Sequence, residues 1–203
     1  MRTQLTRALA LLALFVIGCQ TTPPTEAKRE TLDDESRAAL NRFQREDPDL
    51  KNMLDSAYGY AVFPNIGKGG AIVGGAYGRG IVYEQGRMVG YADVRQATIG
   101  AQLGGQTFAE TIVFQNKEAM DKFKANQLTF SATASAVAIK AGAAKTARYS
   151  HGVAVFTMPN GGLMFEASVG GQQFTYTSAE NAGGTTQPSE RRTTVEERTT
   201  ETR

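Results

Sequence analysis

The spacing of apolar residues separates a helical N-terminal part from a strand-rich remainder. Within residues 31–57, apolar side chains recur every three or four positions, at Leu32, Ala39, Leu40, Phe43, Leu50, Met53, Leu54 and Ala57. This period predicts two amphipathic helices, each with one buried face. Thr31 with Asp34 resembles a capping box and predicts the start of the first helix. Pro48 ends that helix after about Glu46, and Asp49 is expected to cap the second.

Beyond residue 58 the pattern changes to short apolar runs separated by glycine. Strands are expected near 60–63, 71–77, 80–84, 88–94, 98–103, 111–114, 128–134, 152–158 and 163–169. The pairs Gln85-Gly86 and Asn160-Gly161 predict hairpin turns. Asn116 is expected to cap a helix that reaches about Ala125. We therefore expect an α+β fold, in which short N-terminal helices pack on a glycine-rich, mainly antiparallel β-sheet or barrel-like core with one inserted helix.

The start of the chain follows the pattern of an export signal. Arg2 and Arg7 precede an unbroken apolar run over 8–17, and this combination is typical of a secretory signal peptide. The run is too short for a helix that spans a bilayer, which needs about 20 apolar residues. It ends in Val16-Ile17-Gly18-Cys19, which resembles the lipobox of bacterial lipoproteins. We expect a signal peptide over 1–18, cleavage before Cys19, and attachment of lipid to its thiol.

Cys19 is the only cysteine of the chain, so no internal disulfide can form. An unpaired cysteine in an exported protein needs an explanation, and acylation at the cleavage point provides one. The alternative is an ordinary secreted protein with one unpaired cysteine. Lipoproteins of this kind carry two or three acyl chains, which hold a membrane far more firmly than one chain does. Because Gln20 rather than Asp follows the cysteine, we expect an outer-membrane location facing the periplasm.

The expected mature chain has no net charge. Removing residues 1–18 takes away two basic residues and no acidic one, which leaves 20 Lys and Arg against 20 Asp and Glu. A neutral chain lacks the basic footprint of nucleic-acid binding, so no nucleic-acid partner is expected. A flexible tether is expected over 19–30, where two prolines stand among threonines. One domain should follow over 31–177, and then a disordered polar tail over 178–203.

Side chains suited to catalysis or metal binding are scarce. His151 is the only histidine, so clustered zinc ligands cannot form, and no Gly-x-Ser-x-Gly motif presents a serine nucleophile. The run Gly67-Lys68-Gly69 departs from the phosphate-binding loop, in which Ser or Thr follows the lysine. We expect no enzyme, no cofactor and no metal. The glycines of 67–80 either allow a ligand to approach the backbone closely or serve only tight turns and strand packing.

The same region carries a family resemblance. Ordered blocks match at Tyr60-Ala-Val-Phe-Pro64, Ile66 to Gly80, Ile99 to Gln106, Glu110 to Phe123, Leu128 to Ala144 and Tyr149 to Gly171. Together they resemble the SYLF domain family, often described as lipid-binding SYLF domains, over about residues 51–176. The resemblance implies a compact α+β domain, and eukaryotic members bind phosphoinositides and actin. Here residues 26–47 hold seven acids and five bases. They lack the basic character that helps those members bind membranes, so both roles carry over poorly.

These observations predict a lipid-anchored cell-envelope protein with a non-enzymatic SYLF-type module that binds lipid or membrane. Lys68 and Arg79 bracket the glycine-rich segment and are the candidate contacts to phospholipid headgroups. Since glycines flank both, we expect them to be solvated. The alternative is a structural or protein-interaction lipoprotein, which binds another envelope protein and no lipid beyond its own anchor.

Overall fold

The computed structural model describes residues 25–70, 73–99, 105–128, 136–161 and 171–183. The expected signal peptide, Cys19 and the strands expected at 128–134 and 163–169 lie wholly or almost wholly outside these ranges, as does the chain beyond residue 183. Among the described residues, none of the helices combines the length and the apolar character that crossing a bilayer requires.

The N-terminal helices are present, but their starts differ from the sequence expectation. Helix α2 (Glu26–Glu46) begins before Thr31, whose hydroxyl donates to the carbonyl of Ala27 inside the helix and caps nothing. Helix α3 (Asp49–Ser56) has no side-chain cap at Pro48. Asp49 does not act as the cap either; the side chain of Asp47 accepts a hydrogen bond from the backbone N–H of Asp49 at 3.1 Å.

The strands form one seven-stranded sheet in the described part of the chain, in the order β5-β6-β4-β1-β2-β3-β7. Its members are β1 (Gly59–Gly70), β2 (Val73–Glu84), β3 (Arg87–Ile99), β4 (Gly105–Phe114), β5 (Val137–Ala138), β6 (Val153–Gly161) and β7 (Gln172–Ser178). All pairings are antiparallel except β5 with β6. The α+β class is confirmed, and the sheet is open rather than a closed barrel. Six expected short strands are four long ones, because extended glycine continues a strand as readily as it ends one.

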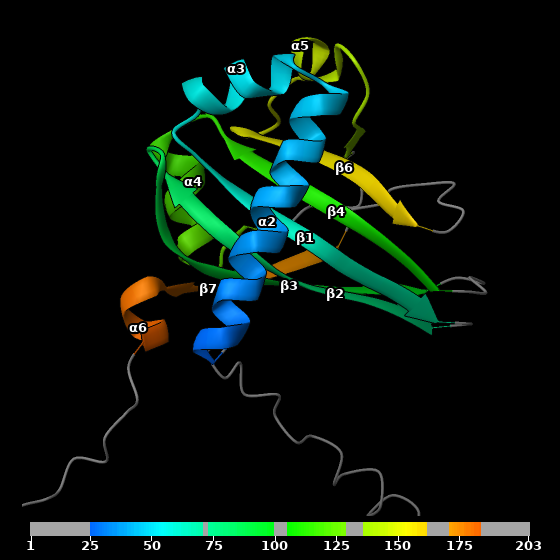
Figure 1. Ribbon diagram of the computed structural model, residues 1–203, viewed down its shortest axis with the longest axis vertical. Coiled ribbons are helices and arrows are strands. Elements are labelled where there is room, and N and C mark those ends of the chain that lie inside the picture. Colours follow the sequence, from blue (N-terminus) through cyan, green and yellow to red (C-terminus); the bar gives the residue numbers. More distant parts are fainter. Residues whose placement is uncertain (1–24, 71–72, 100–104, 129–135, 162–170, 184–203) are drawn as a thin grey trace, which may run out of the picture.

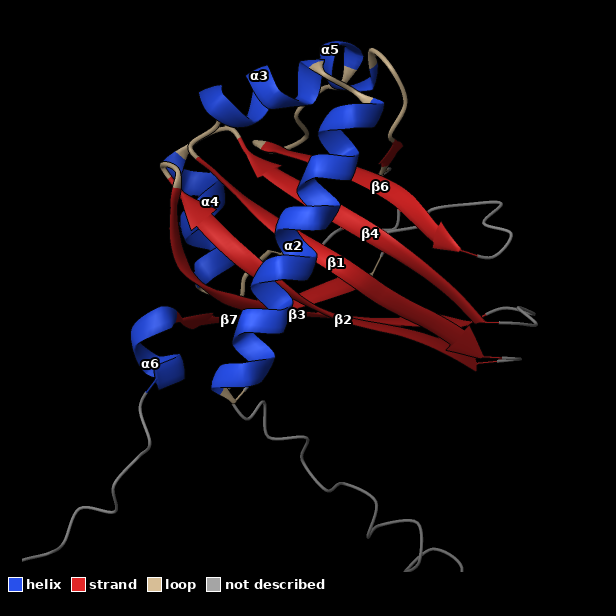
Figure 2. Ribbon diagram, viewed as in Figure 1, coloured by secondary structure: helices blue, strands red, loops and turns tan. Residues whose placement is uncertain are grey.

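Helices cover both faces of this sheet (Figure 1). Helix α2 lies across one face, with α3 and α5 (Ala143–Thr146) near its C-terminal end, and a core around Phe43 and Phe156 fills this layer. Helix α4 (Lys117–Lys124) packs on the other face through Met120 and Phe123. The sheet curls around that second core (Figure 2), so the Phe174 ring of β7 lies 5.8 Å from Phe63 of β1. We call the α2 side the outer face and the α4 side the inner face.

Two turn predictions and one cap have different outcomes. Gln85 and Gly86 form the β2–β3 hairpin with positive φ angles of 50° and 76°, as predicted. Asn116 caps α4 by accepting from the backbone N–H of Ala119 at 3.0 Å, also as predicted. Asn160-Gly161 is not a turn, since both residues belong to β6. The Asn160 side chain instead donates to the carbonyl of Pro64.

The folded domain extends further at both ends than the expected 31–177. Residues 26–30, expected in the tether, form the first turns of α2. Residues 179–183, expected in the polar tail, form α6 (Ala179–Gly183). Arg29 donates from Nη1 to the carbonyl of Ala182 at 2.8 Å, and this hydrogen bond joins the start of α2 to α6.

Candidate functional site

A β-bulge in β1 decides which side chains face inward. Ala61 and Phe63 point to the inner core, but the register with β2 and β4 shifts between Val62 and Ile66. One extra residue reverses the alternation of a strand. Pro64, which has no N–H for the ladder, lies inside the bulge. After it the even positions point inward, so Ile66 and Lys68 face the inner side and Gly67 faces outward.

Lys68 and Arg79 therefore lie on opposite faces of the sheet. Lys68 is paired with Ala76 of β2 and is only 9% exposed. Arg79 is paired with Asn65 and points to the outer face. The expectation that both are solvated is wrong for Lys68, and the structure does not bring the two together as one site.

Lys68 belongs to a polar row on the inner face. The row follows the ladder from Gln106 of β4 through Lys68 and Ala76 to Gln96 of β3 and Gln172 of β7. Gln172 closes it by donating from Nε2 to Oε2 of Glu110 on β4 at 2.9 Å. Polar side chains thus cover one end of the aromatic inner core.

Glu110 is a fully buried carboxyl group in this arrangement. Burial raises its pKa to about 7, against a smaller lowering by the Gln172 hydrogen bond. Oε1 of Glu110, Oε1 of Gln172 and the hydroxyl of Thr157, the β6 residue paired with Glu110, have no hydrogen-bond partner in the described structure. Because Oε1 of Glu110 receives no donor that would stabilise a negative charge, the neutral acid suits these surroundings.

The outer face carries a second polar cluster, around Arg79. Its Nε donates to Oδ1 of Asp93 on β3 at 2.9 Å, and its Nη2 donates to the hydroxyl of Tyr77 at 3.2 Å. The Tyr77 hydroxyl in turn donates to Asp93 at 3.1 Å. Partial burial and the Asp93 carboxylate raise the pKa of Tyr77, which keeps this hydroxyl protonated. Arg79 and Asp93 neutralise each other and fix the ring of Tyr77.

Tyr77 lies among glycines on the outer face of the sheet. It is 47% exposed and is the one large apolar side chain so exposed among the described residues. Its ladder neighbours are Gly67 of β1 and Arg95 of β3. Figure 1 shows the end of β1 and the start of β2 extending past α2, so that no helix covers their outer side there. We call this surface the outer tip face; it consists of Gly67, Gly69, Gly75, Tyr77 and Arg95.

The glycines of β1 and β2 fall into two groups. A Cβ on Gly80 would lie 2.5 Å from the carbonyl oxygen of Val62, and one on Gly78 would lie 2.6 Å from Ile66. These two glycines are required by packing. A Cβ on Gly67 or Gly69 would meet nothing within 4 Å, and neither residue has a positive φ. The fold itself gives no reason for glycine at those two exposed positions.

The described residues hold no cluster of three or more His, Cys, Asp or Glu side chains that could bind a metal ion. His151 is exposed in the turn before β6, with a positive φ of 52°. Sequence reasoning missed Tyr77, Asp93 and Glu110. Glu110 carried a signal, since it is a lone charge inside the apolar run from Phe108 to Phe114.

The chain belongs to the SYLF domain family. Residues 95–184, from the end of β3 to α6, match the family model Ysc84, described as Las17-binding protein actin regulator. One relative is Beta cell expansion factor A of Aeromonas veronii, which is 30% identical over 156 residues. The match covers 74% of this chain and 59% of the relative, so the chain spans about three fifths of that protein's length.

Proposed function

We propose that this protein is a lipid-anchored envelope protein whose SYLF domain is a non-enzymatic module that touches membrane lipid through the outer tip face. Cys19 carries the anchor, and the domain contributes a second, weaker contact. The lipobox-like sequence before Cys19 and the family resemblance support the first and second parts of the proposal. The proposal assigns no chemical reaction and no cofactor to the domain.

The observation that carries the proposal is the unexplained pair of glycines beside an exposed tyrosine. Glycine within a strand costs stability and often marks a place where a ligand approaches the backbone. Gly67 and Gly69 are exposed with open space above them. Tyr77 presents an apolar ring with a polar hydroxyl, the combination enriched where protein meets the membrane interface.

The charge of this face points to a shallow contact. Arg79 is paired with Asp93, whereas the exposed side chain of Arg95 makes no ion pair or hydrogen bond within the described structure. One unpaired arginine near an anionic surface gains about 1 kcal/mol. The proposed contact therefore depends on Tyr77 and Arg95, with Arg79 positioning the tyrosine. Lys68, which points to the inner side, is not part of it.

The test is co-sedimentation with vesicles of anionic or neutral phospholipid at low and moderate salt. The chain from residue 19 onward, carrying Cys19→Ser, lacks both the apolar run over 8–17 and the anchor and keeps the domain. Adding Tyr77→Ala with Arg95→Gln should weaken binding to anionic vesicles by about tenfold, a change of about 1.4 kcal/mol. Arg87→Gln is the matched control, because Arg87 is an exposed arginine at the β2–β3 hairpin. Lys68→Gln should also leave binding unchanged.

Two results would count against the proposal in different ways. If the anchorless chain binds no vesicle at either salt, the lipid-binding module is lost and the protein-interaction lipoprotein is favoured. If binding occurs but survives the double substitution, the activity stands and the outer tip face is the wrong site.

A further inference from the structure

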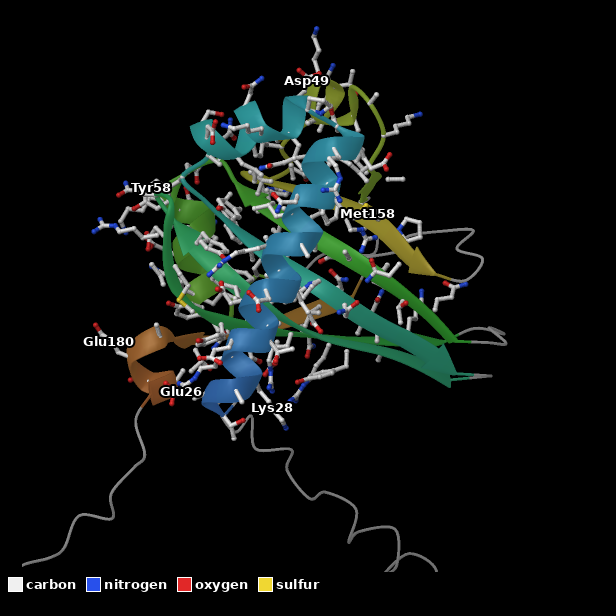
Figure 3. The ribbon with its side chains drawn as sticks, in the orientation of Figure 1. Glu26, Lys28, Asp49, Tyr58, Met158 and Glu180 are labelled. Atoms are coloured by element: carbon white, nitrogen blue, oxygen red, sulfur yellow. The ribbon has the colours of Figure 1, made fainter. Side chains whose placement is uncertain are left out.

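A groove of about 360 Å³ lies between the C-terminal turns of α2 and the end of β6. Its lining residues are Arg42, Arg45, Glu46, Ile139, Met158 and Pro159. In Figure 3, the labelled Met158 lies beside α2. The groove is separate from the outer tip face, because the two share no residue.

Two arginines on one wall of the groove have unused hydrogen-bond donors. Arg42 makes one long bond, from Nη2 to the carbonyl of Pro159 at 3.5 Å. The side chain of Arg45 is exposed and forms no hydrogen bond or ion pair with the described residues. The two are three residues apart on α2, so they lie on the same side of the helix. Two guanidinium groups so placed can bind the same carboxylate. Either of them can form two parallel N–H···O hydrogen bonds to it.

The net charge of the groove suits a singly charged ligand. Glu46 stands on the same wall and forms no ion pair among the described residues. Two arginines and one glutamate leave a single positive charge. A monoanion balances this charge, whereas a phosphate dianion would exceed it and meet the Glu46 carboxylate.

The opposite wall is apolar and unsuited to a peptide. Ile139 is half-buried and is fixed by a 2.9 Å bond from its N–H to the carbonyl of Thr157. Met158 and Pro159 come from β6. An added peptide strand would meet Pro159, which has no N–H and whose carbonyl already accepts from Arg42. An aliphatic chain needs no such partners and gains from apolar contact.

We propose that this groove binds a free fatty acid, with the carboxylate on Arg42 and Arg45 and the adjoining part of the chain on Ile139 and Met158. The volume falls in the range of small-molecule pockets, about 300 to 1,000 Å³. This site takes single molecules from solution, whereas the proposed membrane contact concerns a lipid surface. Either can fail without the other.

The experiment uses the chain from residue 19 onward, carrying Cys19→Ser, with decanoate below its micelle concentration as the probe. Binding is followed by calorimetry and by the ¹³C-methyl resonances of methionine and isoleucine. Decanoate should shift the Met158 and Ile139 methyl signals. Acetate carries the charge without the chain, octyl glucoside the chain without the charge, and inorganic phosphate a different anion. Each should bind at least about tenfold more weakly.

Substitution locates the site. Arg42→Gln with Arg45→Gln should weaken decanoate binding by about tenfold or more, while Arg87→Gln should not change it. Tyr77→Ala with Arg95→Gln should also bind decanoate normally, which separates this site from the outer tip face. The proposal is overturned if decanoate moves neither methyl signal, if acetate or phosphate binds as tightly as decanoate, or if the double arginine variant binds as the parent does.

Discussion

Gln172 on β7 and Glu110 on β4 are joined by a hydrogen bond of 2.9 Å across the inner side of the sheet, although three strands separate them in the sheet order. Both side chains are fully buried. The backbone of β7 pairs with β3, so this bond and the ring contact between Phe174 and Phe63 tie the curled end of the sheet to its centre. The bond also places a carboxyl group where its charge is costly.

The free energy of unfolding should fall as pH rises from the pKa of Glu110 in the unfolded chain to its higher pKa in the folded domain. Its pKa is raised from 4.5 to about 7 by burial, so the folded state holds a proton that the unfolded state releases between these values. The loss amounts to about 3 kcal/mol and is complete just above pH 7. Glu110→Gln should remove this dependence and should be at least as stable as the parent at pH 8.

Urea unfolding at several pH values between 5 and 8 measures this effect. Glu30→Gln, at an exposed position of α2, is the control and should keep the parent's pH dependence. A constant difference in unfolding free energy between parent and Glu110→Gln over this range would show that Glu110 is not the titrating group.

Asp47 should be essential for stability. It is fully buried and accepts from the backbone N–H groups of Asp49, Gly142 and Ala144, the last at 2.6 Å. These bonds join the α2–α3 turn to α5. Asp47→Asn should cost about 1 to 3 kcal/mol, because an amide replaces an acceptor with a donor and leaves a buried N–H unsatisfied. Thermal unfolding measures the loss.

Asp49→Asn is the matched control, since Asp49 contributes its charge at the start of α3 and no side-chain cap. It should change the unfolding free energy by about 0.5 kcal/mol. Equal effects of the two substitutions would mean that the hydrogen bonds of the Asp47 carboxylate add nothing to the stability of the domain.

The two groups of glycines should respond differently to alanine. Gly80→Ala should destabilise the domain by about 1 to 3 kcal/mol, because its Cβ would overlap the Val62 carbonyl and the Phe63 ring. Gly67→Ala should be neutral or stabilising by up to about 1 kcal/mol, since the space is open and the unfolded chain loses freedom. Melting temperatures test both values.

The same pair separates packing from binding. If the absence of a side chain at Gly67 allows the outer tip face to contact the membrane, Gly67→Ala should weaken vesicle binding while the melting temperature stays level or rises. A Gly67→Ala protein that melts lower and binds normally would assign this glycine to the fold.

Cys19→Ser should abolish incorporation of labelled palmitate and release the protein from the membrane fraction, because the thiol is the proposed acylation site. Thr21→Ser, two residues on, should alter neither result. In density-gradient separation the parent should band with outer-membrane markers. Sedimentation of Cys19→Ser with membranes together with label uptake would refute the anchor, and banding with inner-membrane markers would refute the location.

The sequence predicted those parts of the fold that depend on local rules. The apolar period indicated the buried faces of α2 and α3, and the side chain of Asn116 and the Gln85-Gly86 pair fixed a helix start and a hairpin. The expectation that glycine marks strand boundaries is wrong for Gly78 and Gly80, which lie inside β2 and allow it to contact β1 closely.

The candidate site was harder to predict, because it depends on strand register. Lys68 and Arg79 look alike in the sequence, each beside glycine. Their different surroundings follow from the bulge and from Asp93, whose position opposite Arg79 is set by the β2–β3 pairing. No local pattern indicates such a pairing.

The bulge in β1 also bears on how this strand can change. The face on which a residue after Val62 lies depends on the number of residues that separate it from the bulge as well as on its side chain. Losing one residue there would turn Lys68 and Ile66 to the outer face and Gly67 and Gly69 to the inner face, with no substitution at any of them. Insertions and deletions in this short stretch should thus be far less tolerated than substitutions, and the spacing between the Tyr60-Ala-Val-Phe-Pro64 block and the glycines that follow should be held constant among related chains.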